Sequence, residues 1–181
     1  MKTKFALIIF VGLLLSSCIS EGSKSQGKGY QGQSGQITTE LSQAEKDGLL
    51  FMWEEEKMAR DVYITLSNKY GDQTLSNISQ SEQKHMNAVK NLLSQIGMVP
   101  PVDENSIGVF FNNEIKNMYA ELIQRGEVSI SDAWHVGRDI ELLDIEDLQS
   151  RLSQTADPGI QKVYGNLLNA SYKHLDAFNG Q

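Results

Sequence analysis

Apolar side chains recur every three or four residues along four long segments of the chain, which span residues 49–70, 75–96, 134–148 and 160–178. This period is that of one face of an α-helix, so each segment predicts an amphipathic helix that buries its apolar face. The sequence shows no long run of strict apolar–polar alternation, which a half-buried strand would require. These patterns predict an all-α fold.

The breaks between the segments predict how the helices connect. Gly71-Asp72 is a tight break, so the first two helices should pack antiparallel. Residues 97–108 contain two of the three prolines and begin a longer connection. A short extra helix is expected at about 113–125. The later starts have good capping residues, namely Ser129 or Ser131 for the third long helix and Asp157 with Pro158 for the fourth.

The first residues predict export rather than fold. Residues 1–17 contain Lys2 and Lys4, then an apolar run, then small residues before Cys18. This layout is typical of a secretory signal, and its end resembles the bacterial lipoprotein signal, in which the cysteine carries the lipid. An ordinary secreted protein with a spare thiol is the alternative. Residues 18–37, rich in Gly, Ser and Gln, predict a flexible tether, which leaves 38–179 for one folded domain.

Charge and cysteine content exclude several functions. Removal of Lys2 and Lys4 with the signal takes the formal net charge from −7 to −9. Because no basic stripe remains, nucleic acid is not an expected partner. Cys18 is the only cysteine, so an internal disulfide or a thiolate metal site is excluded.

Polar side chains interrupt each predicted apolar face. A charge inside a helix bundle is costly unless it is paired or bound to a metal ion. One interruption per helix therefore predicts that these side chains meet at a common interior point. They are Glu56; Glu82 with His85; Glu141 with Asp144; and Ser171 with His174.

The spacing of Glu82 and His85 is E-x-x-H, which places both side chains on one helical face and is a signature of metal sites in helix bundles. The position of each residue on the helix also predicts which of the three consecutive glutamates at 54–56 points inward. Glu56 should point inward, whereas Glu54 and Glu55 should be solvated. Arg60 and Tyr63, one and two turns further on, can form hydrogen bonds within the site.

Several of these stretches resemble known families. EKMARDVY (56–63) resembles the first-helix motif of rubrerythrin-type ferritin-like proteins, and SEQKH (81–85) resembles their second-helix E-x-x-H. GDQTLSNISQSEQKHM, HVGRDIELLDIEDL and NLLNASYKHLDAF together resemble the DUF2202 family of ferritin-like proteins, over roughly residues 40–178. The resemblance implies a ferritin-like antiparallel four-helix bundle with an extra short helix in the crossover.

The resemblance also implies a carboxylate-bridged iron centre. Glu56, Glu82, His85, Glu141 and His174 match its ligand positions, and Asp144 is a further carboxylate. Ser171 stands where the second E-x-x-H has a glutamate, so two metal ions, one ion, an asymmetric pair completed by Asp144, and an empty site all stay open. Oxygen and imidazole ligands suit iron or manganese.

The expected function is a lipid-anchored iron protein with oxidase-like or peroxidase-like chemistry towards oxygen or peroxide. The alternatives are a non-enzymatic metal-binding or storage protein and a metal-free interaction protein at the cell surface. The expected partners are metal ions and, through lipidated Cys18, the membrane. The expected location is the bacterial cell envelope, at the outer membrane or cell surface, and a homo-oligomer is compatible with the sequence.

Overall fold

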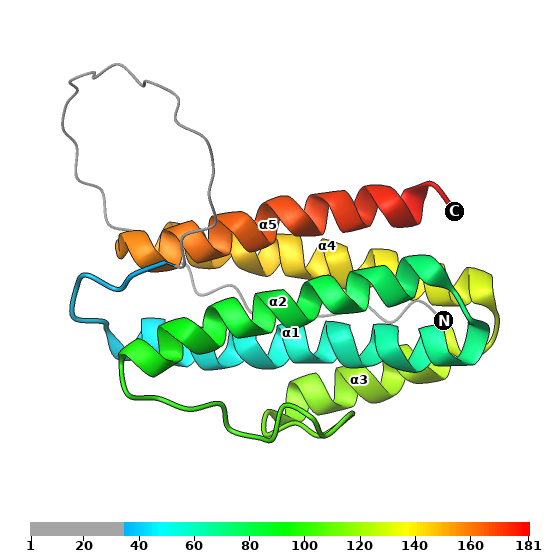
Figure 1. The fold of residues 1–181 in the computed structure, drawn as a ribbon, viewed down its shortest axis with the longest axis horizontal. Coiled ribbons are helices and arrows are strands. Elements are labelled where there is room, and N and C mark those ends of the chain that lie inside the picture. The colour runs from blue at the N-terminus through cyan, green and yellow to red at the C-terminus, as the bar shows by residue number, and fades with distance from the viewer. Residues whose placement is uncertain (1–34) are drawn as a thin grey trace, which may run out of the picture. The chain divides into compact units, whose positions relative to one another are not determined.

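The computed structural model describes residues 35–181, which form five helices and no strand (Figure 1). The prediction of an all-α fold is therefore confirmed. The predicted signal, Cys18 and most of the predicted tether lie outside the described residues. Within residues 35–181, no helix combines the length and the apolar character of a membrane span. The helices are α1 (Gln43–Tyr70), α2 (Gln73–Gln95), α3 (Asn113–Gly126), α4 (Ile130–Gln154) and α5 (Pro158–Asn179).

The four long helices pack as two antiparallel pairs, α1 with α2 and α4 with α5 (Figure 1). The short helix α3 follows the connection from α2 and packs against α1 and α4. This is the bundle with one elaborated crossover that the sequence predicts.

Local sequence explains where the helices start and stop. Gly71 ends α1 with a φ of 68°, a conformation that glycine adopts without strain. Side chains cap every start, since each accepts a hydrogen bond from the first turn's backbone. The caps are Ser42, Asp72, Asn112, Ser129 and Asp157.

The apolar core consists of two clusters at different levels of the bundle. One contains Leu66, Leu75 and Phe178, and the other contains Trp53 and Leu92. Between these two levels, each long helix carries its polar interruption. The clusters therefore enclose a polar layer in the middle of the bundle.

Helix α1 is buried on all sides in its middle, and this contradicts one prediction. Glu54 and Glu55, expected to be solvated, are each only 3% exposed. The connection between α2 and α3 covers the side of α1 that a bare four-helix bundle would leave to water. Glu54 anchors it, because its Oε1 accepts hydrogen bonds from the backbone N–H of Phe111 at 2.6 Å and Asn112 at 3.1 Å.

A buried ion-pair network on α1 holds the same connection. Lys57 Nζ donates to Asp61 Oδ2 and to the carbonyl oxygen of Ser106, both at 2.6 Å. Asp61 also accepts from the backbone N–H of Gly108 at 2.9 Å. Arg60 donates to Asp61 and to the connection, so the prediction that it bonds within the polar site was wrong.

Replacing Asp61 by alanine should destabilise the protein by about 3–5 kcal/mol, because it leaves Lys57 buried without its partner. Urea unfolding measures the effect. The matched control is Asp47→Ala on the exposed surface of the same helix, expected within about 0.5 kcal/mol of the parent. A loss below about 1 kcal/mol for Asp61→Ala would contradict the anchoring role.

Candidate metal centre

Side chains from all four long helices meet in the polar layer. α1 supplies Glu56, α2 supplies Glu82 and His85, α4 supplies Glu141 and Asp144, and α5 supplies His174. All are buried except His174, whose side chain is 12% exposed. The structure thus brings the six predicted residues to one region, as their place on the helix faces indicated. Their role as metal ligands stays a prediction.

Five of the six residues form two triads that share Glu82. Glu56, Glu82 and His85 offer ligand atoms within 4.8 Å of one another, and so do Glu82, Glu141 and His174. His85 Nδ1 lies 2.5 Å from Glu82 Oε2 and 3.2 Å from Glu56 Oε2. His174 Nδ1 lies 2.8 Å from Glu82 Oε1 and 3.5 Å from Glu141 Oε2. Each oxygen of Glu82 therefore faces a different imidazole.

Several of these ligand atoms are buried without a hydrogen-bond partner. Among residues 35–181, Glu56 Oε1, Glu82 Oε1, Asp144 Oδ1 and His174 Nδ1 have none. The 2.8 Å contact between His174 and Glu82 is short, yet it lacks hydrogen-bond geometry. Three of these atoms, Glu56 Oε1, Glu82 Oε1 and His174 Nδ1, belong to residues of the two triads. Because unpaired buried polar atoms cost free energy, a bound cation fits this set.

The environment shifts the pKa values of the clustered side chains in opposite directions. Burial opposes ionisation of Glu82, but the two imidazoles outweigh it and lower its pKa to about 2. Burial also opposes protonation of His174, but Glu141 and Glu82 outweigh it and raise its pKa to about 9. The pKa of His85 is raised in the same way, by Glu56 and Glu82 against its burial. Glu82 is therefore the anionic centre of the cluster.

The other carboxyl groups favour the protonated form. Burial, reinforced by neighbouring carboxylates, raises the pKa of Glu141 to about 8 and that of Asp144 to about 7. Burial also raises the pKa of Glu56 well above its usual value. Without a cation the site holds protons, and a cation that binds there must displace them.

Asp144 belongs to neither triad. Ser171, which stands in a glutamate position of the resembled motif, lies within hydrogen-bonding distance of Asp144 Oδ2. Ser171 thus holds Asp144 at the edge of the site. Tyr63 donates to Glu141 Oε1 at 2.6 Å, as the sequence led us to expect, and so orients that carboxylate.

One buried acid was missed by the sequence argument. Glu55 lines a cavity of about 10 Å³ together with Glu56, Glu82, Glu141 and Asp144. Its Oε2 is also without a hydrogen-bond partner in the described part of the chain. The apolar period gave no sign of this, because Glu55 lies off the stripe that Glu56 continues.

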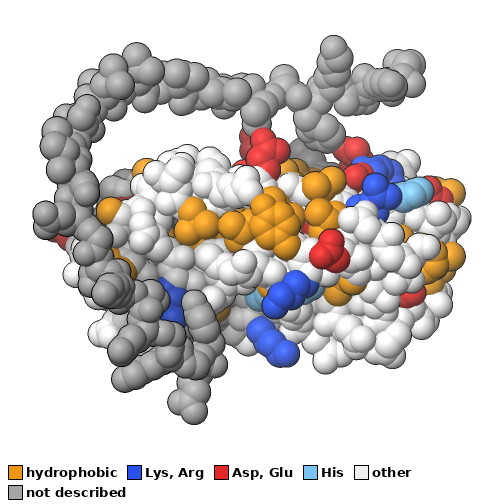
Figure 2. Space-filling model, turned by 90° about the horizontal axis from the view of Figure 1, so that it is seen from above, with side chains coloured by type: hydrophobic (Ala, Val, Ile, Leu, Met, Phe, Trp, Pro, Cys, Tyr) orange, Lys and Arg blue, Asp and Glu red, His pale blue; other side chains and the backbone are white. Residues whose placement is uncertain are grey.

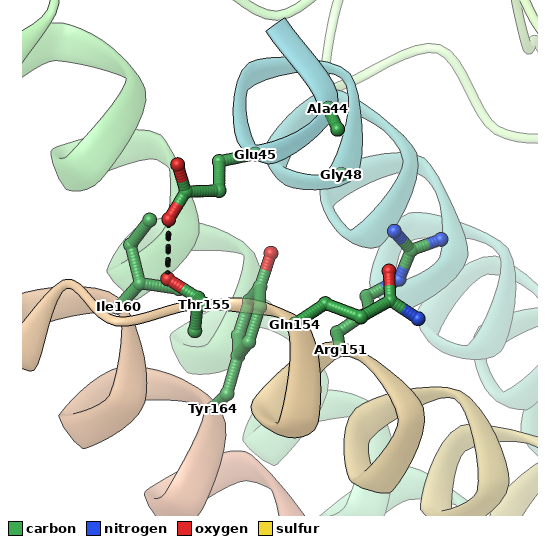
Figure 3. Close-up of a pocket in the computed structure, with 8 residues that line it drawn as sticks. All are labelled: Ala44, Glu45, Gly48, Arg151, Gln154, Thr155, Ile160 and Tyr164. Carbon is green, nitrogen blue, oxygen red and sulfur yellow. Dashed lines mark hydrogen bonds between the residues drawn. The ribbon is translucent and has the colours of Figure 1, made fainter. Parts of the chain in front are cut away.

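A second small cavity, of about 30 Å³, lies where α1 begins and α4 passes into α5 (Figure 3). There Glu45 accepts a 2.7 Å hydrogen bond from Thr155, which ties α1 to the connection between α4 and α5. Tyr164 and Arg151 also line it. No metal-ligand cluster of the described residues includes any of these side chains, so the cavity is not a candidate metal centre.

The outer face on the α5 side carries side chains of mixed type (Figure 2). Figure 2 looks onto the side where α5 lies and shows a row of hydrophobic side chains with acidic and basic ones around it. The exposed large apolar residues of α4 and α5 are Leu142 and Tyr172, at 52% and 44%. Of the candidate ligands, the carboxylates are buried, and the side chains of His85 and His174 are 11% and 12% exposed.

Comparison with known proteins agrees with this fold. The protein MJ0754 of Methanocaldococcus jannaschii, described as uncharacterized, is 47% identical over 138 residues, which is 76% of this chain and 75% of that protein. Its crystal structure, titled as that of a hypothetical protein, matches with a TM-score of 0.77 at 46% identity, covering 80% of this chain and 83% of that one. Residues 45–181 match the family described as "Uncharacterized protein domain (DUF2202)". The predicted resemblance to DUF2202 is thereby confirmed, and the chain belongs to the DUF2202 family.

Proposed function

We propose that this protein is a ferritin-like metal-binding protein that holds two divalent metal ions, with iron as the first candidate. The observation that supports it most is the pair of buried triads from four helices, whose unpartnered ligand atoms converge around Glu82. One ion would be held by Glu56, Glu82 and His85. The other would be held by Glu82, Glu141 and His174.

Charge balance supports two ions. Glu56, Glu82, Glu141 and Asp144 supply four negative charges when ionised, which two divalent cations neutralise. Carboxylate and imidazole ligands without thiolate suit iron or manganese. Asp144, held by Ser171, contributes charge beside the ions without standing in either triad.

The surrounding residues favour redox chemistry with a small substrate. Iron bound to carboxylate and imidazole ligands supplies access to both the ferrous and the ferric state and reacts with oxygen or peroxide. The cavity of about 10 Å³ holds one water-sized molecule, so an organic substrate does not fit there. Tyr63 fixes Glu141, and the two apolar clusters exclude bulk water from above and below.

Oxygen consumption tests this activity. Metal-free protein loaded anaerobically with Fe(II) should consume added oxygen or peroxide, and His85→Ala should lower the rate about tenfold or more through lost metal affinity. The control is His135→Ala, which removes an exposed histidine of α4. Protein that binds Fe(II) but shows no turnover would contradict the redox role. That outcome would favour metal storage or a structural metal, which the enclosed position of the site also fits.

From the sequence of residues 1–18 we further propose that a lipid on Cys18 anchors the protein in the bacterial cell envelope. Mass spectrometry of the membrane fraction tests this. A Cys18→Ser variant should lose the lipid mass and leave that fraction.

A further inference from the structure

Glu55 has no role in either triad, yet it is buried beside them. It is 3% exposed and lines the small cavity together with four carboxylates of the centre. Its Oε2 finds no partner within residues 35–181. A buried carboxylate oxygen without a partner is destabilising, so stability does not account for it.

Asp147 extends this set of acidic side chains towards solvent. It lies on α4, one turn after Asp144, and is half-buried. Glu55 and Asp144 line the same cavity, and Asp147 lies on the face of α4 that carries Asp144. A line of carboxylates therefore runs along the seam between α1 and α4, from the surface to the wall of the central cavity.

Arg151 is the nearby cation on the same side of α4. Its guanidinium points towards α1 (Figure 3). The group lies over the ring of Phe51, 4.4 Å from the ring centroid. Three carboxyl groups against one guanidinium leave an excess of acidic side chains on this line.

We propose that Glu55, Asp147 and Asp144 form an uptake site for divalent cations, through which an ion passes from solvent to the ligands around Glu82. Hard cations such as Fe²⁺ or Mn²⁺ bind carboxylate oxygens, so each carboxylate of the line replaces part of the ion's water shell. The inference deepens the proposed function and rests on it. It assigns to Glu55 a transient contact with the ion rather than a permanent one.

Loading with Co²⁺ tests the uptake site, because cobalt bound to imidazole and carboxylate absorbs visible light. Stopped-flow absorption at 0.15 M salt follows the loading of metal-free protein. Glu55→Gln and Asp147→Asn should each load about tenfold more slowly and reach the same final absorption and stoichiometry. The control Glu146→Gln removes the same charge from an exposed neighbour on α4 and should load within twofold of the parent.

The outcomes separate this inference from the proposed function. A parent protein that takes up no Co²⁺ would overturn the proposed metal centre itself. A parent that loads, with both variants loading at its rate, would overturn the uptake site alone. Loss of the final absorption in Glu55→Gln would make Glu55 a permanent ligand and would also overturn the uptake role. Should Glu55→Gln fail to fold, the half-buried Asp147→Asn decides.

Discussion

Replacing Glu82 by glutamine should abolish the binding of both metal ions. Glu82 is the residue that the two triads share, and each of its oxygens faces a different imidazole. The amide keeps the shape of the side chain but removes the charge and one acceptor oxygen. His174→Ala, by contrast, should remove only the ion of its own triad. Equilibrium dialysis against Mn²⁺, with metal analysis of the protein, measures both stoichiometries.

The variant should remain folded, which keeps the result interpretable. Without the Glu82 charge, each histidine keeps the other carboxylate that favours its protonation, Glu56 for His85 and Glu141 for His174, and with less opposing charge it can also be buried as the neutral form. Circular dichroism checks the helix content. The matched control is Glu121→Gln on the exposed side of α3, which should bind as the parent does. Retention of two ions by Glu82→Gln would contradict the shared-ligand arrangement.

Removing the metal should lower the melting temperature by at least 10 °C. An ion present at about 1,000 times its Kd stabilises the folded state by about 4 kcal/mol per site, and each kcal/mol shifts the melting temperature of a domain of this size by about 2–4 °C. Calorimetry with and without Mn²⁺, before and after chelation, measures the shift. If the metal-free protein melts at the same temperature as the Mn²⁺-loaded protein, the proposal that two bound ions stabilise the fold is contradicted.

The size of this shift should depend on pH. The pKa values of Asp144 at about 7, Glu141 at about 8 and His174 at about 9 are all raised in the folded state. The metal-free folded protein therefore binds more protons than the unfolded chain, and its stability falls as pH rises from about 4.5 to 9. Glu82, with its pKa lowered to about 2, reverses this trend only in the acid range, where stability is lost as pH falls from about 4.5 through 2.

Melting curves at pH 5.5, 7 and 8.5 test the sign of this dependence. The metal-free protein should melt at lower temperature at each higher pH. The Mn²⁺-loaded protein should change less, because the cations take the place of the protons. Metal-free protein that becomes more stable from pH 5.5 to 8.5 would contradict the electrostatic account of the cluster.

The polar layer could be predicted from the sequence because helix geometry fixes which side chains share a face. Glu82 and His85 continue the apolar stripe of Val89 and Leu92, so their inward direction follows from the period alone. The same holds for Glu56 on α1 and for His174 on α5. The helix ends could also be predicted, because caps and turns depend on only a few neighbouring residues.

What the sequence could not show is where the long connection lies. Glu54, Arg60 and Lys57 sit on the sides of α1 that a simple bundle exposes, and only the connection between α2 and α3 buries them. A loop of irregular structure carries no periodic pattern that points to its partner. Glu55 was also assigned to water, because it lies off the stripe that Glu56 continues, but it is buried against α4. The serine at 171 left the number of ions open, and its contact with Asp144 appears only in three dimensions.

Anomalous diffraction from crystals grown with Fe(II) under anaerobic conditions tests the metal centre most directly. Data collected above and below the iron absorption edge should show two peaks beside Glu82, one towards His85 and the other towards His174. Maps without any iron peak at these side chains, from protein that was offered excess Fe(II), would contradict the metal centre.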